Sequence, residues 1–512
     1  MKINFRFAIN LLLLVAATFS HLQAASLNIL YNFTASNNGG TNPYGSLVQG
    51  GDGNFYGTTN SGGIGDNGTV FKITPAGVLT TLASFNVDNG ASPYAGLVQG
   101  SDGNFYGTTL SGGSSLGTIF KITPAGVLTS LASFNGANGA SPYASLVQGS
   151  DGNFYGTTQA GGSSNNGTVF KVTPAGVLTA LASFNDFNGS TYAGLVQGSD
   201  GNFYGTTQVG GSNSAGTVFM ITPAGILSTL LSFDGANGTT PQAGLVQGGD
   251  GNFYGTTQFG GTGSAGTVFK ITPTGTLTTL VSFNSANGAN PVAGLVQGSD
   301  GNFYGTTVWG GSADLGTVFK MTPAGVLTTL ASFNGTNGAN PSAALAQGSD
   351  GNLYGVTFSG GISNQGVIFQ VVLSPPTLTF EAESLHYTAS GATVSLQTDK
   401  NSSGGKWVEL AGNSTGDHID FTLPNILAGT YQLRMKWKGN NNRGILQLSV
   451  DGATLGSKLD QYSADQTYPT TTFGNVTFGI TGNHTIRLTV TGKNSSSSAR
   501  LLSADKFTFI GQ

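Results

Sequence analysis

The residues best placed to repeat one chemistry along this chain are aspartates that open a recurring pentapeptide. Asp-Gly-Asn-Phe-Tyr begins at Asp52, Asp102, Asp151, Asp200, Asp250 and Asp300, and it returns as Asp-Gly-Asn-Leu-Tyr at Asp350. Carboxylate and amide oxygens at this spacing match part of a calcium-binding loop, but the remaining oxygen ligands of such a loop do not follow. Asp, Asn and Gly also build tight turns. We therefore expect the pentapeptide to be a hairpin turn rather than a metal site.

Other groups that could carry acid–base chemistry are scarce around these turns. Between Leu27 and Ser374 the chain has no Glu, His, Arg or Cys. The lysines of this region occupy the same place in five copies, and the other aspartates occur singly: Lys72, Lys121, Lys171, Lys270 and Lys320; Asp66, Asp88, Asp186, Asp234 and Asp314. Acid–base catalysis needs titratable groups within reach of one substrate atom. No such pair is visible, so the sequence leaves the question of an enzyme open and favours a protein without catalysis.

The pentapeptide recurs every 49 or 50 residues, which is typical of a repeat architecture. In the third copy, apolar and β-branched runs separated by turn residues predict four short strands, at 144–148, 154–159, 168–173 and 177–184. Four antiparallel strands in each of seven copies predict an all-β fold, a seven-bladed β-propeller over residues 26–373.

The two ends of the repeat region predict how the ring closes. The last copy stops after its third strand, at residues 367–372, and has no fourth. The missing strand matches Ser26–Phe33, whose pattern is that of fourth strands such as Leu128–Phe134. An N-terminal strand that completes the last blade would close the ring and remove two exposed strand edges. The alternative, an open solenoid, would need capping repeats instead.

The longer connections of each copy differ in sequence and are expected on one face, opposite the pentapeptide. The residues after Thr-Thr, or Val-Thr in the last copy, are Asn60, Leu110, Gln159, Gln208, Gln258, Val308 and Phe358. Phe259 and Trp309 lie beside two of them. Aromatic rings next to amides suit sugars, so Phe259 and Trp309 are candidate ligand-binding residues. Packing between blades is the alternative, and the same face could bind a protein.

The repeat region resembles a known family in several segments. Gly96–Val98, Asp250–Thr257 and Gly266–Thr272 resemble the GloVer family of bacterial tandem repeats, and the resemblance covers about residues 26–372. The period and the Gly62-Gly63 pair are also similar to kelch repeats, although the kelch tryptophan is absent. The resemblance to GloVer implies a secreted or surface propeller and brings no established catalytic activity.

The composition changes after Pro375-Pro376, since 11 of the 18 Lys and Arg lie from Lys400 onward. Strand patterns follow at 393–397, 407–410, 418–422, 430–438, 444–450, 472–480, 484–491 and 506–510. They predict a linker at residues 374–378 and a β-sandwich, a jelly roll, at 379–512.

This segment resembles galactose-binding-like modules of polysaccharide-degrading enzymes, near carbohydrate-binding families 6 and 35. The matching pieces are Phe380–Glu383, Gly416–Phe421, Ala428–Tyr431, Val450–Gly452, Gly482–Ile486 and Asp505–Phe507. The resemblance implies a structural calcium on Glu381, Glu383 and Asp505, with carboxylate oxygens as its ligands. Ordinary surface acids are the alternative interpretation.

The same resemblance implies a sugar site near the late strands of the module. An aromatic residue and an asparagine hold the ligand in such modules, and the candidates here are Trp407, Tyr462, Tyr468 and Asn494. The aromatic-Asn pair expected just before the late aspartate is replaced by Leu501–Ala504. Lys436, Lys438 and Arg443 could favour an acidic glycan or form a solvated face.

The N-terminus predicts an export signal over residues 1–25. Lys2 and Arg6 precede an apolar stretch, Ala8–Phe19, and small residues follow at Ala24 and Ala25. No second apolar stretch occurs, so no membrane span is predicted and the protein is expected outside the cytoplasm, secreted or periplasmic. A net charge of -4 gives no electrostatic reason to bind nucleic acid.

Three functions remain at this point. The favoured one is a secreted, non-catalytic protein that binds a polysaccharide or cell-surface glycan, with the C-terminal module as sugar binder and the propeller as an interaction scaffold. The second is a propeller glycoside hydrolase or polysaccharide lyase with an appended binding module. The third is a structural or adhesive surface protein.

Overall fold

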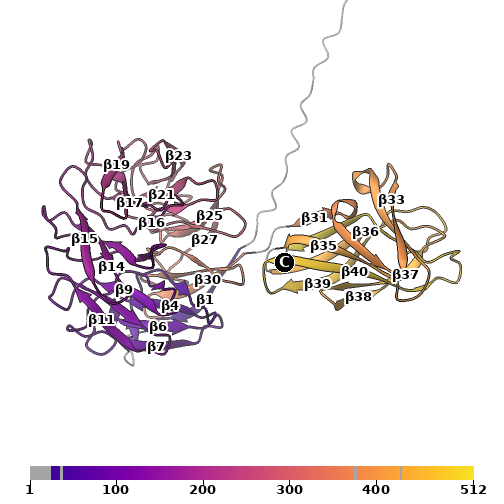
Figure 1. The fold of residues 1–512 in the computed structure, drawn as a ribbon, viewed down its shortest axis with the longest axis horizontal. Coiled ribbons are helices and arrows are strands. Elements are labelled where there is room, and N and C mark those ends of the chain that lie inside the picture. The colour runs from indigo at the N-terminus through magenta and orange to yellow at the C-terminus, as the bar shows by residue number, and fades with distance from the viewer. Residues whose placement is uncertain (1–24, 35–38, 374–376, 427–428, 512) are drawn as a thin grey trace, which may run out of the picture.

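The computed structural model describes residues 25–34, 39–373, 377–426 and 429–511. They form two all-β parts, over residues 25–373 and 377–511 (Figure 1). The predicted export signal, apart from Ala25, and residues 374–376 of the predicted linker lie outside the described residues. The described helices are two short 3-10 turns, η1 (Ala382–Ser384) and η2 (Ser403–Gly405). In the described chain, no helix has the length and apolar character needed to cross a membrane.

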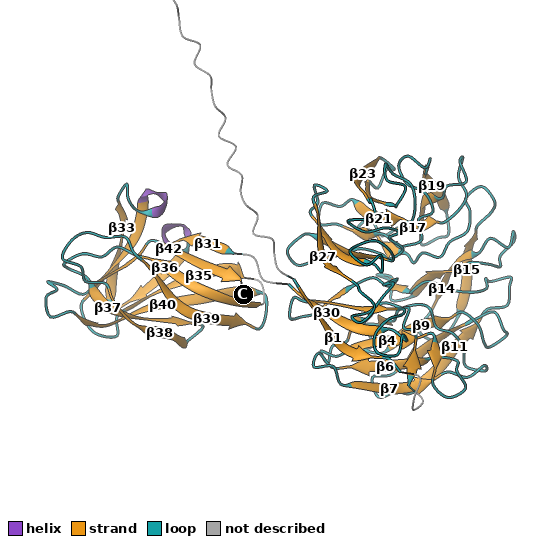
Figure 2. Ribbon diagram, turned by 180° about the vertical axis from the view of Figure 1, so that it is seen from behind, coloured by secondary structure: helices purple, strands orange, loops and turns teal. Residues whose placement is uncertain are grey.

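Seven four-stranded antiparallel sheets make up the first part, as the repeats predicted (Figure 2). We call them blades one to seven. They contain, in order, β3 (Val48–Gln49), β4 (Phe55–Thr59), β6 (Thr69–Ile73) and β7 (Leu79–Ser84); β8 (Val98–Gln99), β9 (Phe105–Thr109), β10 (Thr118–Ile122) and β11 (Leu128–Ser133); β12 (Val147–Gln148), β13 (Phe154–Thr157), β14 (Thr168–Val172) and β15 (Leu178–Ser183); β16 (Val196–Gln197), β17 (Phe203–Thr207), β18 (Thr217–Ile221) and β19 (Leu227–Ser232); β20 (Val246–Gln247), β21 (Phe253–Thr257), β22 (Thr267–Ile271) and β23 (Leu277–Ser282); β24 (Val296–Gln297), β25 (Phe303–Thr307), β26 (Thr317–Met321) and β27 (Leu327–Ser332); and β28 (Ala346–Gln347), β29 (Leu353–Thr357), β30 (Val367–Val372) and β1 (Ser26–Asn32). A further short pair joins β2 (Gly40–Thr41) to β5 (Ser61–Gly62).

The N-terminal strand completes the seventh blade, which confirms the predicted closure. β1 runs antiparallel to β30, with Ser26 opposite Val372 and Asn32 opposite Val367. The first and last blades are also in direct contact, because the ring of Phe55 stacks on that of Tyr354 at 4.0 Å between centroids. The ring is therefore closed and no open solenoid is formed.

Aromatic stacks hold the blades together. The tyrosine of each pentapeptide packs on the phenylalanine of the next one at 4.0 or 4.1 Å, in the pairs Tyr56–Phe105, Tyr106–Phe154, Tyr155–Phe203, Tyr204–Phe253, Tyr254–Phe303 and Tyr354–Phe55. Leu353 takes the place of the phenylalanine between blades six and seven. Each aromatic pair adds about 0.5–1.5 kcal/mol beyond the apolar area that it buries.

A belt of glutamines links every blade to its neighbour near the pentapeptide turns. The side-chain oxygen of Gln99 accepts a hydrogen bond from the N–H of Gly51 in the preceding blade at 3.2 Å. The same bond recurs in the pairs Ser101–Gln148, Ser150–Gln197, Ser199–Gln247, Gly249–Gln297, Ser299–Gln347 and Ser349–Gln49. The seventh bond returns to the first blade, so the belt is continuous around the ring.

The pentapeptide is a hairpin turn, as predicted. One oxygen of Asp52 accepts the N–H of Asn54 at 3.1 Å, and the other accepts the Asn54 side-chain amide at 2.7 Å and the Tyr56 hydroxyl at 2.8 Å. Gly53 has a φ of 79°, which suits glycine at the tip. Burial opposes ionisation of Asp52, but the hydrogen bonds from Asn54 and Tyr56 outweigh it and hold the pKa of Asp52 below its usual value.

The second part is a β-sandwich, as predicted. One sheet contains β31 (Leu378–Glu381), β42 (Lys506–Gly511), β36 (Gly429–Lys436) and β39 (Thr470–Phe478), and another contains β32 (His386–Ser390), β35 (His418–Ile426), β40 (Gly482–Lys493), β37 (Gly444–Val450) and β38 (Ala453–Asp460). A three-stranded sheet contains β33 (Ala392–Thr398), β34 (Lys406–Gly412) and β41 (Leu501–Ala504). Their facing side chains, among them Phe421, Leu433 and Phe507, form one buried core.

Candidate functional site

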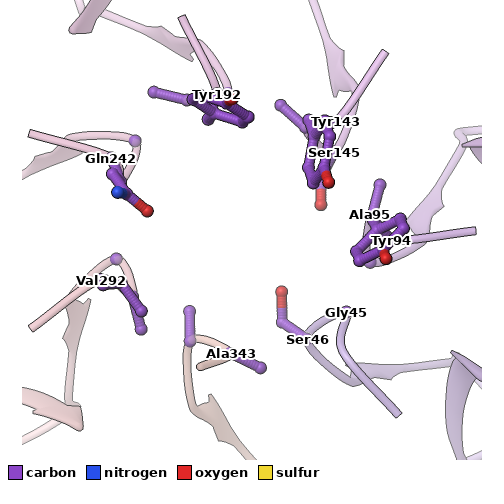
Figure 3. Close-up of a pocket in the computed structure, with 18 of the residues that line it drawn as sticks. Gly45, Ser46, Tyr94, Ala95, Tyr143, Ser145, Tyr192, Gln242, Val292 and Ala343 are labelled. Carbon is purple, nitrogen blue, oxygen red and sulfur yellow. The ribbon is translucent and has the colours of Figure 1, made fainter. Parts of the chain in front are cut away.

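Residues from every blade line the central channel of the propeller (Figure 3), and seven of them, one from each blade, occupy equivalent positions in the repeat. These seven residues, which we call the channel residues, lie in the connection that leads into the first strand of each blade, and all seven border a hollow of about 510 Å³. They are Tyr44, Tyr94, Tyr143 and Tyr192 in blades one to four, and Gln242, Val292 and Ser342 in blades five to seven. The channel is therefore aromatic on the side of blades one to four, whereas smaller or non-aromatic side chains line it on the side of blades five to seven.

The backbone before each of these residues fixes its direction. In six blades a residue with positive φ and then a proline precede it, as in Ser141-Pro142-Tyr143, where the φ of Ser141 is 54°. The Ser141 N–H donates to the carbonyl of Leu116 in the preceding blade at 2.9 Å, and the Ser141 carbonyl accepts the N–H of Gln159 at 3.1 Å. The second bond brings the variable residue after Thr-Thr next to the channel residue, so both long connections emerge on one face, as predicted.

The four tyrosines form a continuous wall, which we call the tyrosine arc. Their ring centroids are 5.0 Å apart for Tyr44 and Tyr94, 4.8 Å for Tyr94 and Tyr143, and 4.9 Å for Tyr143 and Tyr192. The Gln159 amide donates to the Tyr192 hydroxyl at 2.5 Å. Burial and the neighbouring Tyr94 raise the pKa of Tyr143 to about 12, so its hydroxyl is neutral at physiological pH and can both donate and accept.

A second hollow of about 230 Å³ opens beside the first, on the side of blades five to seven. We call it the side pocket, and it is lined by Tyr44, Gln242, Gln258, Asn290, Val292, Val308, Trp309, Asn340, Ser342 and Phe358. Trp309 and Phe358 are 45% and 37% exposed. The Gln242 amide donates to the side-chain oxygen of Gln258 at 2.7 Å, which orients two amides on one wall. The side pocket thus combines open aromatic faces with fixed amides.

The two candidates of the propeller part differ in position. Trp309 lines the side pocket, whereas Phe259, at the equivalent position of the preceding blade, is 42% exposed and lies outside both hollows. Neither side chain is packed away between blades. Sequence reasoning missed the tyrosine arc. The available signal was the residue after the repeated proline, which varies within otherwise constant copies.

The structure brings the three predicted calcium ligands close together in the sandwich. Ser403 contacts two of them, since its hydroxyl donates to Glu381 at 2.8 Å and its N–H donates to Asp505 at 2.8 Å. Lys436 pairs with Asp505 at 3.0 Å. One oxygen of Glu381 and one of Glu383 are buried without a hydrogen-bond partner among the described residues. Burial, together with the charges of Glu381 and Asp505, raises the pKa of Glu383.

The three carboxylates do not by themselves surround a metal position in this structure. Within the described ranges, no three His, Cys, Asp or Glu side chains already surround one metal position. The unpartnered oxygens of Glu381 and Glu383 are nevertheless of the kind that calcium prefers, so the donor chemistry fits the ion.

Two of the predicted sugar-binding residues lie around Lys438. Its ammonium is 5.1 Å from the ring centre of Trp407 and 5.7 Å from that of Tyr468. Trp407 is only 3% exposed, and Arg443 covers its ring at 4.6 Å. The Tyr468 hydroxyl donates to Asp399. Trp407 therefore offers no open ring face to a ligand in this structure.

The other two lie around Asp460. The N–H of Tyr462 and the side-chain amide of Asn494 donate to the Asp460 carboxylate at 3.0 and 2.7 Å. Both residues are half-buried. A further tryptophan of the module, Trp437, continues the alternation of buried residues along β36, is itself buried, and donates its ring N–H to Thr471 at 2.9 Å.

Several solved structures are similar to this chain. A xanthan lyase from Paenibacillus is 21% identical, with 41% of this chain and 22% of the lyase covered and a TM-score of 0.26. A GH26-CBM35 β-(1,4)-mannanase from Podospora anserina is 19% identical, with 27% and 28% covered and a TM-score of 0.20. An exo-β-1,3-galactanase from Phanerochaete chrysosporium is 11% identical, with 95% and 100% covered and a TM-score of 0.33. The chain thus spans less than a third of the lyase and of the mannanase. No curated protein matches it.

A family model covers most of the chain. The model of the Gloeobacter/Verrucomicrobia repeat matches residues 16–198 and 190–406. These ranges contain all seven pentapeptides and all seven channel residues, together with the six prolines that directly precede a channel residue. The chain therefore belongs to the Gloeobacter/Verrucomicrobia repeat family.

Proposed function

We propose that this protein is a non-catalytic glycan-binding protein whose propeller holds saccharide at the mouth of its channel. The side pocket carries this proposal, because the open rings of Trp309 and Phe358 stand beside the amides of Gln258 and Asn340. The C–H faces of a sugar pack on aromatic rings, and amides pair with its hydroxyl groups. Membership of the family assigns no activity to the chain, so the proposal is based on the residues of the site.

The chemistry of the lining supports binding rather than bond cleavage. Every residue that borders the channel hollow or the side pocket is uncharged at neutral pH. Glycoside hydrolysis uses a pair of carboxyl groups on either side of the scissile bond. The repeated aspartates, such as Asp151, lie in the pentapeptide turns and are engaged by Asn153 and Tyr155.

The sandwich is proposed as a second attachment point for glycan. Calcium would be held by Glu381, Glu383 and Asp505, where it would reduce the repulsion among three neighbouring carboxylates and satisfy the unpartnered oxygens of Glu381 and Glu383. The ion would join the end of β31 and η1 to the residue that directly precedes β42, which is a structural role. In keeping with the predicted export signal, we propose that the protein works outside the cytoplasm.

The experiment that tests the proposal is retention of the intact protein on insoluble and immobilised polysaccharides. Trp309→Ala should lower retention, whereas Phe259→Ala, its matched control in the neighbouring blade, should leave retention unchanged. Equal retention of wild type and Trp309→Ala would show that the propeller does not hold the glycan at Trp309, and would contradict this part of the proposal. Release of reducing ends by the intact protein would replace the proposal with the enzyme alternative.

A further inference from the structure

We propose that the side pocket takes the terminal unit of an uncharged saccharide chain, and that the next units rest in the channel hollow against the tyrosine arc. This inference rests on the proposed function and adds two features to it: which part of the glycan is recognised, and what charge it carries. The terminal sugar unit can be the last unit of the main chain or the last unit of a side branch.

The two hollows are parts of one site. Tyr44, Gln242, Val292 and Ser342 line both of them, so the side pocket and the channel hollow lie directly next to each other. Their volumes of about 230 and 510 Å³ differ, and the smaller one has the exposed rings. A ligand of more than one sugar unit can therefore extend from the side pocket into the channel hollow.

The shape of the opening favours a chain end over the middle of a chain. Segments of all seven blades surround the channel, and their side chains converge on it (Figure 3). A chain that crosses a binding site needs a groove that is open on two opposite sides. Here the side opposite the side pocket is closed by the tyrosine arc, whose rings follow one another at 4.8 to 5.0 Å. A chain that continued straight from the side pocket across the channel hollow would meet this arc, which favours a ligand that ends within the site.

The polarity of the lining selects an uncharged ligand. The described residues around both hollows include no Lys, Arg or His, so a uronate or sulfate group would lose water without gaining a counter-charge. Amides and hydroxyls pair well with sugar hydroxyls because each can donate and accept. The neutral hydroxyl of Tyr143 and the Gln242–Gln258 pair supply such groups on opposite sides.

The test compares probes that differ in one feature at a time. Calorimetric titrations of the full chain would use linear neutral gluco- and manno-oligosaccharides of two to four units, a cyclic glucan without ends, and linear uronate oligosaccharides. Linear neutral probes are expected to bind, while the cyclic and acidic probes should bind at least tenfold more weakly. Trp309→Ala should weaken all binding by about tenfold, which corresponds to about 1.4 kcal/mol. Tyr143→Ala should weaken the longer probes more than the disaccharide.

The outcomes separate this inference from the proposed function. Equal binding of cyclic and linear probes would overturn recognition of a chain end, and equal binding of acidic probes would overturn the charge preference. Glycan binding would stand in both cases. Loss of affinity in the control Phe259→Ala to the same degree as in Trp309→Ala would contradict the placement in the side pocket. Binding of none of the probes would count against both proposals. Because Trp309 is 45% exposed, its truncation should leave the fold intact, which circular dichroism would verify.

Discussion

Replacing Asp151 with alanine should destabilise the propeller more than the same replacement of any exposed aspartate in its longer loops. Asp151 accepts three hydrogen bonds, from the Asn153 N–H at 3.1 Å, the Asn153 side-chain amide at 2.7 Å and the Tyr155 hydroxyl at 2.8 Å. Tyr155 is 1% exposed, so its hydroxyl would lose an acceptor at the edge of the core. A hydrogen bond contributes about 1 kcal/mol net, and somewhat more when one partner is charged. We expect a loss of about 2–4 kcal/mol.

The assay is urea unfolding of the full chain, with hydrogen exchange of residues 144–184 to report on the altered blade. Tyr155→Phe removes one of the three bonds and should cost about 1 kcal/mol. Asp88→Ala changes an exposed loop aspartate and should stay within about 0.5 kcal/mol of wild type. The double variant at Asp151 and Tyr155 should cost less than the sum of the two, since both changes remove the same bond.

The result that refutes this reasoning is a loss for Asp151→Ala no larger than that for Asp88→Ala. A loss that disappears when calcium is removed by a chelator would have a different meaning. It would show that the aspartate stabilises the blade through a bound ion, and the hairpin interpretation of the pentapeptide would then be wrong.

Four further changes have defined outcomes. Phe33→Ala, at the end of the closing strand, should cost about 3–5 kcal/mol in urea unfolding, because Phe33 is 2% exposed and packs on Phe71. Val356→Thr should stabilise by about 1 kcal/mol in the same assay, since the threonines at this position in the other blades donate to a carbonyl of the next blade, as Thr58 does to Ala95 at 2.9 Å. Burial raises the pKa of the pentapeptide tyrosines, to about 12 in blades three to five, so their contribution is complete below pH 10 and is lost as the pH rises toward 12, which far-UV circular dichroism at increasing pH would detect. A chelator should lower the melting temperature of the sandwich, and Glu383→Gln should reduce that difference; no change with chelator would remove calcium from the proposal.

The fold of the propeller was predictable because its local and long-range signals agree. The pentapeptide marks the first hairpin of each blade, and the count of strands places β1 in the last blade. The channel residues were not recognised as a site, because they are about 50 residues apart in the sequence and come together only when the seven blades close around one axis. The sandwich was harder. β31, β32, β38 and β41 were missed, since short or exposed strands such as Ala453–Asp460 lack a clear alternation of apolar residues.

Residue types also failed to predict exposure in the sandwich. Trp407 looked like a platform for sugars, yet it is buried beneath Arg443 and beside Lys438. Whether a tryptophan faces a ligand or the core depends on which strands flank it, and a single sequence does not contain that information. Trp309, in contrast, is exposed, as expected for a residue in a connection rather than in a strand.

In six of the seven blades, a positive-φ residue and a proline precede the channel residue, and this segment separates the backbone that supports the ring from the side chain that faces the channel. The hydrogen bonds of that segment involve backbone atoms, as for Ser141 with Leu116 and Gln159, so they do not depend on which side chain follows the proline. The ring already accepts tyrosine, glutamine, valine and serine there. The seven channel positions can therefore be substituted independently of the backbone that supports them. Changing their side chains should alter which ligands the channel binds while the fold of the propeller stays the same.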